Sequence, residues 1–498
     1  MTEPTGRRRL ATALPPLAVV AATAAVFLPT LRNGFVNFDD GLGLLTNPHY
    51  RGLGWTQLRW MLTTIFFCNY SPLTWMTFGL DFILWGMAPS GYHLTSVAFH
   101  CAGAAMLSLL ALELFARGRP AAEDRWGAAA AALAFSLHPM RAESVAWAFE
   151  RRDVVCGLFF IAALYLWLRG RRPGETRAAR WRILALGSFL LALSAKVAAA
   201  PLPLVLVIMD VALLKRPSRD VWRDKLPFFA LSALFVAVGL LAQSRCGAVV
   251  PLATAAAGER LLQSVLGLFF YPGKTLWPSR LSPLYEWGLA TVGLPALIGA
   301  LALSAAAFTR RMRPAFLAAF AAYAVIIAPT LGLLKLGHHT VADRYSYLSC
   351  LPWAVLAGAG VRALWSRHAA AASAACLVIL LAMSAMTRRQ IAVWRDSVTL
   401  WRHVLKLDAL SAVGRQNLAD GLLRVGRVGE AVLLLDEQVR LYPRDSDSRR
   451  MLSEVLEQTG ITPADYPRFH DELGREWAAR GEPEKAAWHF KRGAGSAR

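Results

Sequence analysis

The sequence predicts an all-α protein in two parts, a bundle of membrane-spanning helices over residues 1–386 and a helical-repeat domain over residues 387–498. Apolar residues make up 56% of the chain and charged residues only 17%, whereas about a quarter of an ordinary soluble chain is charged. Many apolar runs precede Met386, and a bilayer core demands about 17–25 apolar residues per helix. Beyond Met386 the composition changes abruptly to mixed charge with helical periodicity, which marks one clear domain boundary.

Eleven segments are predicted to span the membrane. The first follows Arg7, Arg8 and Arg9 and lacks a convincing small-residue cleavage site, so we interpret it as a signal anchor. Several of the others are shorter than about 20 residues, as expected for helices that extend past their apolar runs inside a bundle. The predicted spans are 10–32, 92–115, 126–138, 154–169, 183–196, 198–214, 226–243, 289–308, 314–334, 347–365 and 368–386.

The distribution of basic residues predicts the orientation, because cytoplasmic loops are enriched in Lys and Arg. With the N-terminus inside, the short cytoplasmic segments hold 22 of the 54 Lys and Arg, and the longer outer loops before Thr387 hold 13. The other 19 lie in the C-terminal domain beside 16 acids. The net charge of +21 is therefore mainly a topology signal. A nucleic-acid partner would need a basic stripe on one folded face, which the sequence does not indicate.

Two further stretches decide the topology. Residues 72–87 are rich in aromatic side chains but contain Asp81, and residues 261–276 are interrupted by Pro272 and Lys274. We expect both to lie as helices at the outer interface, where Trp and Tyr are favoured. Eleven spans then place the C-terminal domain outside. If only one of the two stretches spans the membrane, the topology downstream inverts.

The C-terminal domain follows the spacing of TPR units, which are 34-residue helix–turn–helix repeats. Small residues at fixed offsets let two helices approach, and large ones fill the groove between them. Such domains bind peptides or proteins along a concave surface, and a generic array of helical hairpins is the alternative. The matching residues are Leu418, Ala419, Leu422, Ala431, Leu435 and Pro443 in the first unit, Leu452 and Ser453 in the second, and Leu473, Gly474, Trp477, Ala486 and Phe490 in the third.

Ionisable residues gather at the predicted outer ends of the spans. Such groups are costly at membrane depth and usually face a cavity or a partner. Two adjacent carboxylates, Asp39 and Asp40, suit a general base or a cation site, although a turn or a helix cap would use the same residues. The histidines show neither HxxxH nor HExxH spacing, so no metal site is predicted. The candidates for binding a lipid phosphate or a sugar hydroxyl are His93, His138, Glu143, Arg151, Asp153, Lys196, Asp343, Arg344 and Tyr345.

These residues carry a resemblance to the membrane glycosyltransferases of the GT-C class, which take a sugar from a polyprenyl phosphate. The sequence resembles in particular the protein O-mannosyltransferases and their relatives with TPR domains. The resemblance covers nearly the whole chain. It rests on Phe38-Asp39-Asp40, Ser71-Pro72-Leu73, Gly91-Tyr92-His93 with His100, the stretch from His138-Pro139 through Glu143 and Trp147 to Arg151 and Asp153, Asp343-Arg344-Tyr345, and the TPR units.

The resemblance implies roles for some of these residues. Asp39 would be the general base that activates an acceptor hydroxyl, with Asp40 as its acidic neighbour, and the sugar would be transferred with inversion. Basic residues such as Arg151, Lys196 and Arg344 would stabilise the departing lipid phosphate. No metal or other cofactor would be needed beyond the lipid-linked donor. The second acid is Asp where the fungal enzymes have Glu, which leaves open whether Asp39 or Asp40 is the base.

The predicted function is therefore transfer of a mannose-like sugar from a polyprenyl phosphate to a hydroxyl on a protein or an envelope glycan. The acceptor would be bound in part by the TPR units, and membrane lipid would be a further partner. The alternative is a non-catalytic scaffold that assembles envelope proteins through those units. A transporter is disfavoured because no paired broken helices or internal repeat is evident. A composition rich in Ala and Arg indicates a bacterial inner membrane, with the site and the C-terminal domain in the periplasm.

The predicted topology can be tested by labelling. A cysteine introduced at Ser446, in a chain whose native cysteines are replaced, should react with an impermeant thiol reagent in cells with a permeabilised outer membrane. A matched cysteine at Gly174, in the predicted cytoplasmic segment 169–182, should react only after the inner membrane is lysed. The reverse pattern would contradict the assigned orientation.

Overall fold

The computed structural model describes residues 5–116, 120–216, 218–246, 257–285, 289–308, 313–332 and 341–495. Within these ranges the named elements are all helices, so the predicted all-α class is confirmed. Contacts divide the chain into two compact units. The first comprises Met1–Phe35 and Leu42–Arg395, and the second comprises Val36–Gly41 and Asp396–Arg498.

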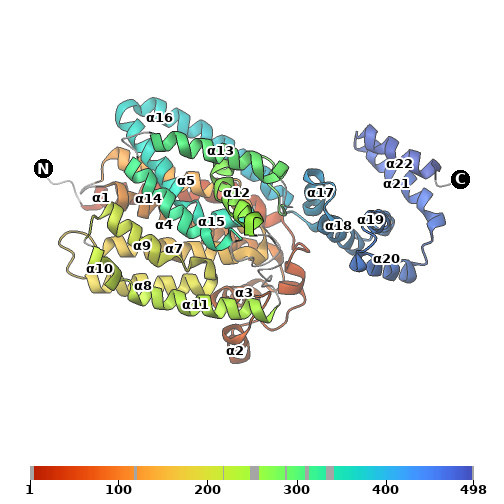
Figure 1. The fold of residues 1–498 in the computed structure, drawn as a ribbon, viewed down its shortest axis with the longest axis horizontal. Coiled ribbons are helices and arrows are strands. Elements are labelled where there is room, and N and C mark those ends of the chain that lie inside the picture. Colours follow the sequence, from red (N-terminus) through yellow and green to blue (C-terminus); the bar gives the residue numbers. More distant parts are fainter. Residues whose placement is uncertain are drawn as a thin grey trace. The chain divides into compact units, whose positions relative to one another are not determined.

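The first unit is a bundle of helices (Figure 1). Its α-helices are α1 (Thr5–Phe27), α2 (Trp55–Thr63), α3 (Pro72–Trp85), α4 (Pro89–Phe115), α5 (Ala122–Ser136), α6 (Arg141–Ala146), α7 (Arg151–Arg169), α8 (Ala178–Ala195), α9 (Leu202–Ile208), α10 (Ser218–Arg223), α11 (Leu226–Arg245), α12 (Ala257–Leu276), α13 (Leu289–Phe308), α14 (Arg313–Ile327), α15 (Ser346–Ser349) and α16 (Leu351–Val393). Short 3₁₀ turns include η3 (Ala148–Glu150), η4 (Val197–Ala199) and η8 (Asp343–Tyr345).

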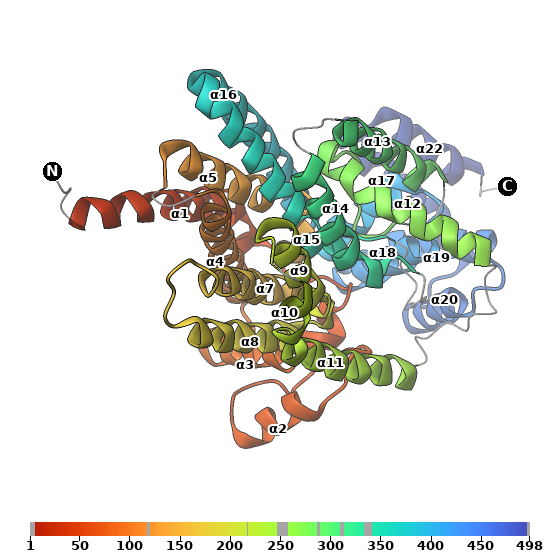
Figure 2. The ribbon, with the colours of Figure 1, turned by 60° about the vertical axis from the view of Figure 1, so that its left-hand side comes forward.

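Small residues let the helices of this bundle approach closely. Helix α4 packs against α1, α5 and α7, while α5 packs against α16 and α12 against α13, as Figure 2 also shows. A Cβ atom at Gly358 of α16 would lie 2.4 Å from the carbonyl oxygen of Gly127 in α5, and one at Gly299 of α13 would lie 2.0 Å from that of Phe269 in α12. Backbone contact of this kind is typical of helix pairs inside membranes, where small side chains line the interface.

Five helices in the described ranges are long and apolar enough to cross a membrane. These lie in Pro15–Arg32, Pro89–Phe115, Ala178–Ala195, Leu226–Arg245 and Leu351–Val393, and shorter apolar helices cover Val197–Leu213, Val292–Ala305 and Pro314–Thr330. The chain is thus an integral membrane protein. The count of eleven spans, the sidedness and the interfacial position of 72–87 and 261–276 remain predictions, although both stretches are helical, in α3 and α12.

Helix α16 contains two of the predicted spans. The segments 347–365 and 368–386 fall largely within one 43-residue helix whose backbone leaves helical geometry at His368 (φ −142°, ψ 68°). The same helix continues past the predicted domain boundary at Met386. Its last turns are held by the first unit, because Thr387 Oγ1 donates to the carbonyl of Leu137 at 2.7 Å and Trp394, just beyond it, stacks on Trp147. The first unit therefore extends to Arg395.

The second unit contains a series of helices in which most successive members are in contact. They are α17 (Ser397–Leu407), α18 (Ala412–Arg424), α19 (Val428–Leu441), α20 (Ser446–Thr459), α21 (Tyr466–Ala479) and α22 (Pro483–Gly495). Leu418, Ala419 and Leu422 are buried in α18, as their spacing predicts. A Cβ atom at Gly474 would lie 2.5 Å from the ring of Phe490, so this predicted small–large pair is in contact. Identification of the hairpins as TPR units, and peptide binding by them, stay predictions.

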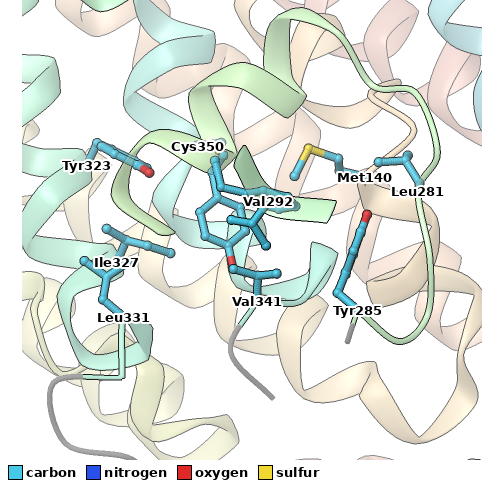
Figure 3. Close-up of a cluster of buried hydrophobic side chains, with 11 residues drawn as sticks. Met140, Leu281, Tyr285, Val292, Tyr323, Ile327, Leu331, Val341 and Cys350 are labelled. Carbon is cyan, nitrogen blue, oxygen red and sulfur yellow. The ribbon is translucent and has the colours of Figure 1, made fainter. Parts of the chain in front are cut away.

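A hydrophobic cluster supports the chain that enters α16 (Figure 3). Val341 lies in this cluster with Tyr285, and Tyr323 and Ile327 contribute to it from α14. The backbone N–H of Ala342 donates to the phenol oxygen of Tyr271 at 3.2 Å. These contacts fix the backbone just before η8, which carries three of the predicted site residues.

Candidate active site

Three connecting segments meet at one end of the bundle. Residues 137–150 join α5 to α7, residues 196–201 follow α8, and residues 341–350 precede α16. Helix α6 contacts both η8 and α7, and α7 packs along α8. The structure thereby brings together Glu143, Asp153, Lys196, Asp343 and Arg344, which the sequence predicts as neighbours in a site.

Glu143 and Arg344 form a two-point ion pair between α6 and η8. Arg344 Nη1 lies 2.5 Å from Glu143 Oε1, and the backbone N–H of Arg344 donates to Glu143 Oε2 at 2.9 Å. The guanidinium also lies over the ring of Tyr345, 5.2 Å from its centroid. Because both the backbone and the side chain of Arg344 bind one carboxylate, the direction of its guanidinium is fixed.

Lys196 joins the ends of α7 and α8. Its Nζ lies 2.5 Å from Glu150 Oε1 and 2.7 Å from Asp153 Oδ1. The second oxygen of Glu150 pairs with Arg152 Nη2 at 2.6 Å, and that of Asp153 accepts from the hydroxyl of Ser144 at 2.8 Å. Burial alone would raise the pKa of Glu150, but the charges of Arg152 and Lys196 outweigh it and hold that pKa well below its usual range.

Asp343, in η8, is almost completely buried. Its Oδ1 accepts from the phenol of Tyr285 at 2.8 Å, and its backbone carbonyl accepts from Ser346 Oγ at 2.5 Å. Burial raises the pKa of Asp343 to about 6, although Lys274 and the phenol hydrogen bond oppose that shift. Asp343 is therefore a group that titrates near neutral pH beside the ion pairs.

Arg151 does not share this environment, and its role in binding phosphate stays a prediction. The side chain is fully buried and forms an ion pair with Asp81 of α3. It also donates to the carbonyl of Tyr92 at 2.7 Å and to Ser96 Oγ at 3.1 Å, and it lies over the ring of Phe78. These contacts enclose the guanidinium between α3, α4 and α7, so we interpret Arg151 as a residue that holds the helices together.

The two predicted histidines are likewise enclosed. His138 uses both ring nitrogens, Nε2 at 3.1 Å from the carbonyl of Thr275 and Nδ1 as acceptor from the N–H of Met140. His93 lies in α4 with Nε2 at 3.4 Å from the carbonyl of Gly34, and its exposed fraction is zero. His138 thus bonds to backbone on both sides of its ring, whereas Nδ1 of the buried His93 has no hydrogen-bond partner among the described residues.

The cations differ in exposure, and this difference selects the ones that a ligand could reach. The exposed fraction of the side chain is 16% for Lys196, 12% for Arg152 and 10% for Arg344, against zero for Arg151. Arg152 also borders a cavity of about 10 Å³, which holds no more than about one water molecule. That cavity is lined by Phe66, Asn69, Ser71, Thr74, Trp75, Phe78, Phe149 and Arg152.

Asp39 and Asp40 belong to the second unit. Asp40 is fully buried and its Oδ2 accepts from the backbone N–H of Val36 at 2.9 Å, as in a turn closed by a side chain. Asp39 is partly exposed. The turn interpretation that the sequence leaves open thus applies to Asp40, while Asp39 keeps contact with solvent.

Sequence reasoning missed three members of these networks. Glu150 and Arg152 flank Arg151 in the motif, but nothing in their spacing reveals that they face Lys196. Asp81 interrupts an aromatic stretch of the sequence, and its partner Arg151 comes 70 positions later. A buried carboxylate in an apolar helix requires a cation, and that requirement was the available signal.

Replacement of Arg151 should mainly destabilise the fold. Arg151→Ala leaves Asp81 buried without its cation, which should lower the free energy of unfolding by about 3–5 kcal/mol. Arg152→Ala, in a more open position, should cost less, and Asp81→Asn added to Arg151→Ala should recover part of the loss. Thermal unfolding in detergent, followed by Trp fluorescence, measures all three. Equal stability of the Arg151→Ala and Arg152→Ala proteins would contradict the structural role.

Asp343 should make stability depend on pH. A carboxyl whose pKa is raised on folding contributes stability that is present below its unfolded pKa of about 3.9 and lost as pH rises through the folded value, here about 6. Asp343→Asn still accepts from Tyr285 but carries no charge. Between pH 5 and pH 7 the wild type should therefore lose about 1 kcal/mol relative to this variant, the rest of the loss falling below pH 5. Glu472→Gln, at an exposed site of α21, is the control, and parallel profiles for all three proteins would refute the assignment.

The chain is similar in sequence to protein O-mannosyl-transferases over part of its length. No family model matches the chain. The chain is similar to protein O-mannosyl-transferase TMTC3 of Mus musculus (28% identical over 186 residues, 35% of this chain and 19% of the relative), to Tmtc1 of Drosophila melanogaster (32% over 160 residues, 30% and 18%) and to tmtc2 of Xenopus laevis (28% over 247 residues, 45% and 28%). Each match spans less than a third of the relative's length.

Two solved structures are also similar. They are the oligosaccharyltransferase AglB from Archaeoglobus fulgidus, with an inhibitory peptide and a dolichol-phosphate (13% identity, TM-score 0.46, 77% of this chain and 56% of that one), and ArnT from Cupriavidus metallidurans, bound to undecaprenyl phosphate (16%, 0.40, 92% and 80%). The resemblance to protein O-mannosyltransferases, predicted from the sequence, is confirmed by these relatives.

Proposed function

We propose that the protein is a membrane glycosyltransferase that moves a sugar from a polyprenyl phosphate to a hydroxyl acceptor. The observation that carries the proposal is the group of partly exposed cations, Lys196, Arg152 and Arg344, held at one end of the bundle by buried carboxylates. The relatives are named protein O-mannosyl-transferases, which supports mannose as the sugar and a protein hydroxyl as the acceptor. We therefore assign a mannose-like sugar and a protein or glycan hydroxyl.

The cations suit a phosphate because their positions are set before the ligand arrives. Lys196 is held by two carboxylates and Arg344 by two contacts to Glu143. Charged donors that are already oriented stabilise negative charge that develops on a leaving group, at no cost of reorganisation. The departing polyprenyl phosphate gains such charge as its bond to the sugar breaks. Lys196, Arg344 and Arg152 would bind the donor and then stabilise its leaving group.

The chemical step requires a base on the acceptor side. An acceptor hydroxyl attacks the anomeric carbon while a carboxylate removes its proton, and the bond between that carbon and the phosphate oxygen breaks with both electrons leaving on the phosphate. One displacement inverts the configuration. We assign the base to Asp39, because Asp39 is partly exposed whereas Asp40 is buried and closes a turn. The reaction so written needs only the lipid-linked donor and no further cofactor.

The surroundings of the reaction follow the predicted topology. We place the site and the C-terminal domain outside the cytoplasm, with the N-terminus inside and a bacterial inner membrane as the host. The helical hairpins would contribute to acceptor binding, since such arrays present extended surfaces to peptides. The scaffold alternative makes the same use of the hairpins but assigns no role to Asp39 or to the exposed cations.

Transfer assays on purified variants test the proposal. The wild type should transfer labelled mannose from a polyprenyl-phosphate donor to a Ser- and Thr-containing peptide. Asp39→Asn keeps the shape of the side chain but is no longer a base, so kcat should fall about 10²–10⁴-fold while donor binding survives. Lys196→Ala should instead weaken donor binding, because it removes a charge partner of the phosphate.

Matched variants separate the roles. Glu472→Gln, an exposed change in α21, should transfer at the wild-type rate. Donor binding is measured separately, by retention of labelled lipid. If Asp39→Asn and Asp40→Asn both transfer at the wild-type rate, neither acid is the base. A wild type that binds no donor and transfers no sugar would contradict the proposal and favour the scaffold.

A further inference from the structure

The segment that carries the two acids is structurally part of the C-terminal domain. The chain leaves the first unit after Phe35 and re-enters it at Leu42. The six residues between, Val36–Gly41, form one compact unit with Asp396–Arg498. Asp39 and Asp40 are thus attached by the chain to the membrane bundle but packed with the helical hairpins.

Asn37 makes the contacts that hold this segment. Its backbone N–H donates to Ser397 Oγ at 2.9 Å. Its side-chain Nδ2 donates to the carbonyl of Asn417 at 2.8 Å and to Asp420 Oδ2 at 2.8 Å. Its Oδ1 accepts from Trp401 Nε1 at 2.7 Å. One short polar residue therefore bonds to both α17 and α18.

The partners determine the orientation of the amide. An indole N–H can only donate, so it must face Oδ1, whereas a backbone carbonyl and a carboxylate can only accept, so both must face Nδ2. An aspartate at this position would set its carboxylate against two acceptors. Only an amide can bond at once to the indole N–H of Trp401, the backbone carbonyl of Asn417 and the carboxylate of Asp420. The contact is therefore specific for Asn or for a residue of the same shape and polarity.

The two helices are close together where Asn37 binds. A Cβ atom at Gly421 of α18 would lie 3.2 Å from that of Ser397 in α17. Trp401 is fully buried in α17, and its ring meets that of Phe38 edge to face with centroids 5.4 Å apart. The partners of Asn37 are therefore parts of two helices in close contact, with Trp401 fully buried and Asp420 partly exposed.

The acids follow directly in the same turn. The N–H of Val36, one residue before Asn37, donates to the carboxylate of Asp40. Asp39 lies between the residue that binds the hairpin and the residue that closes the turn. A displacement of Asn37 would therefore carry Asp39 with it.

We propose that Asn37 is a positioning residue, through which the first helical hairpin of the C-terminal domain sets the place of the general base. The inference rests on the proposed function for its catalytic consequence. Misplacement of a reacting group by about 1 Å can lower a rate about 10²-fold. Loss of the contacts of Asn37 should thus lower kcat. The affinity for the lipid donor should stay unchanged, because the cations proposed to bind the donor belong to the first unit and Asn37 to the second.

Variants in the full-length protein test this step. Asn37→Ala and Trp401→Phe, which removes the indole N–H donor together with one ring of that buried side chain, should each lower kcat about 10–100-fold with an unchanged KM for the donor. Asn37→Asp should be at least as impaired, because its carboxylate faces Asp420. Adding Asp420→Asn to Asn37→Asp restores a donor opposite that carboxylate, so the double variant should recover a large part of the lost kcat.

A control separates positioning from general damage to the domain. Gln438 is buried in α19 and donates to Asp445 Oδ2 at 3.1 Å, and the residues of the segment 36–41 are not among its partners in that contact. Gln438→Ala should therefore lower the unfolding temperature and leave kcat within about twofold of the wild type at a temperature where both are folded. Equal losses of kcat in the Gln438→Ala and Asn37→Ala proteins would overturn the proposal.

Hydrogen exchange supplies a measurement that does not depend on transfer. The amides of residues 36–41 should exchange slowly in the wild type and at least tenfold faster in the Trp401→Phe protein. Unchanged exchange would overturn the proposed attachment, and faster exchange with an unchanged kcat would overturn the positioning role. If the wild type transfers no sugar, the proposed function fails, and the exchange experiment alone then decides whether the hairpin holds the segment.

Discussion

The constraint on which the structure depends is that charges buried inside an apolar bundle must be neutralised where they lie. Each connecting segment at the site end contributes one half of an ion pair, so the pairs tie together elements distant in sequence. Glu143 meets Arg344 across 201 positions, and Lys196 meets Glu150 across 46. Because these groups must be paired, their ion pairs hold the three connecting segments against one another.

The same requirement leaves some cations fully enclosed and others partly exposed. Arg151 satisfies Asp81 with its guanidinium fully enclosed, whereas Lys196, Arg152 and Arg344 keep an edge exposed while their carboxylate partners remain buried. A phosphate at that edge would gain three oriented donors without displacing the buried carboxylates. The carboxylates thus prevent the cations from repelling one another when no ligand is bound, and the exposed edges leave them able to bind an anion.

Periodicity and motif spacing predicted the helices, the hairpins and the residues that gather at one end of the bundle, because these depend on local pattern. They did not predict which carboxylate meets which cation. Asp81 and Arg151 are 70 positions apart. Glu150 and Arg151 are adjacent in the sequence, yet Glu150 pairs with Lys196 and Arg151 with Asp81. Contacts rather than composition also decide where the first unit ends, nine residues beyond Met386. Thr387 and Trp394 follow the last apolar run, yet tertiary contacts to Leu137 and Trp147 retain them in the first unit.

The contacts of Asn37 could likewise not be predicted from local sequence pattern. In the sequence it stands among Phe35, Val36 and Phe38 and draws less notice than the acids beside it. Its importance depends on Trp401 and Asp420, which come more than 360 positions later. The amide of Asn37 bonds to three groups at once, so a displacement of its side chain would break several hydrogen bonds together. The proposed base, Asp39, lies two residues from this anchor and would be positioned by the domain that supplies the partners. The C-terminal domain would then serve catalysis as well as acceptor binding.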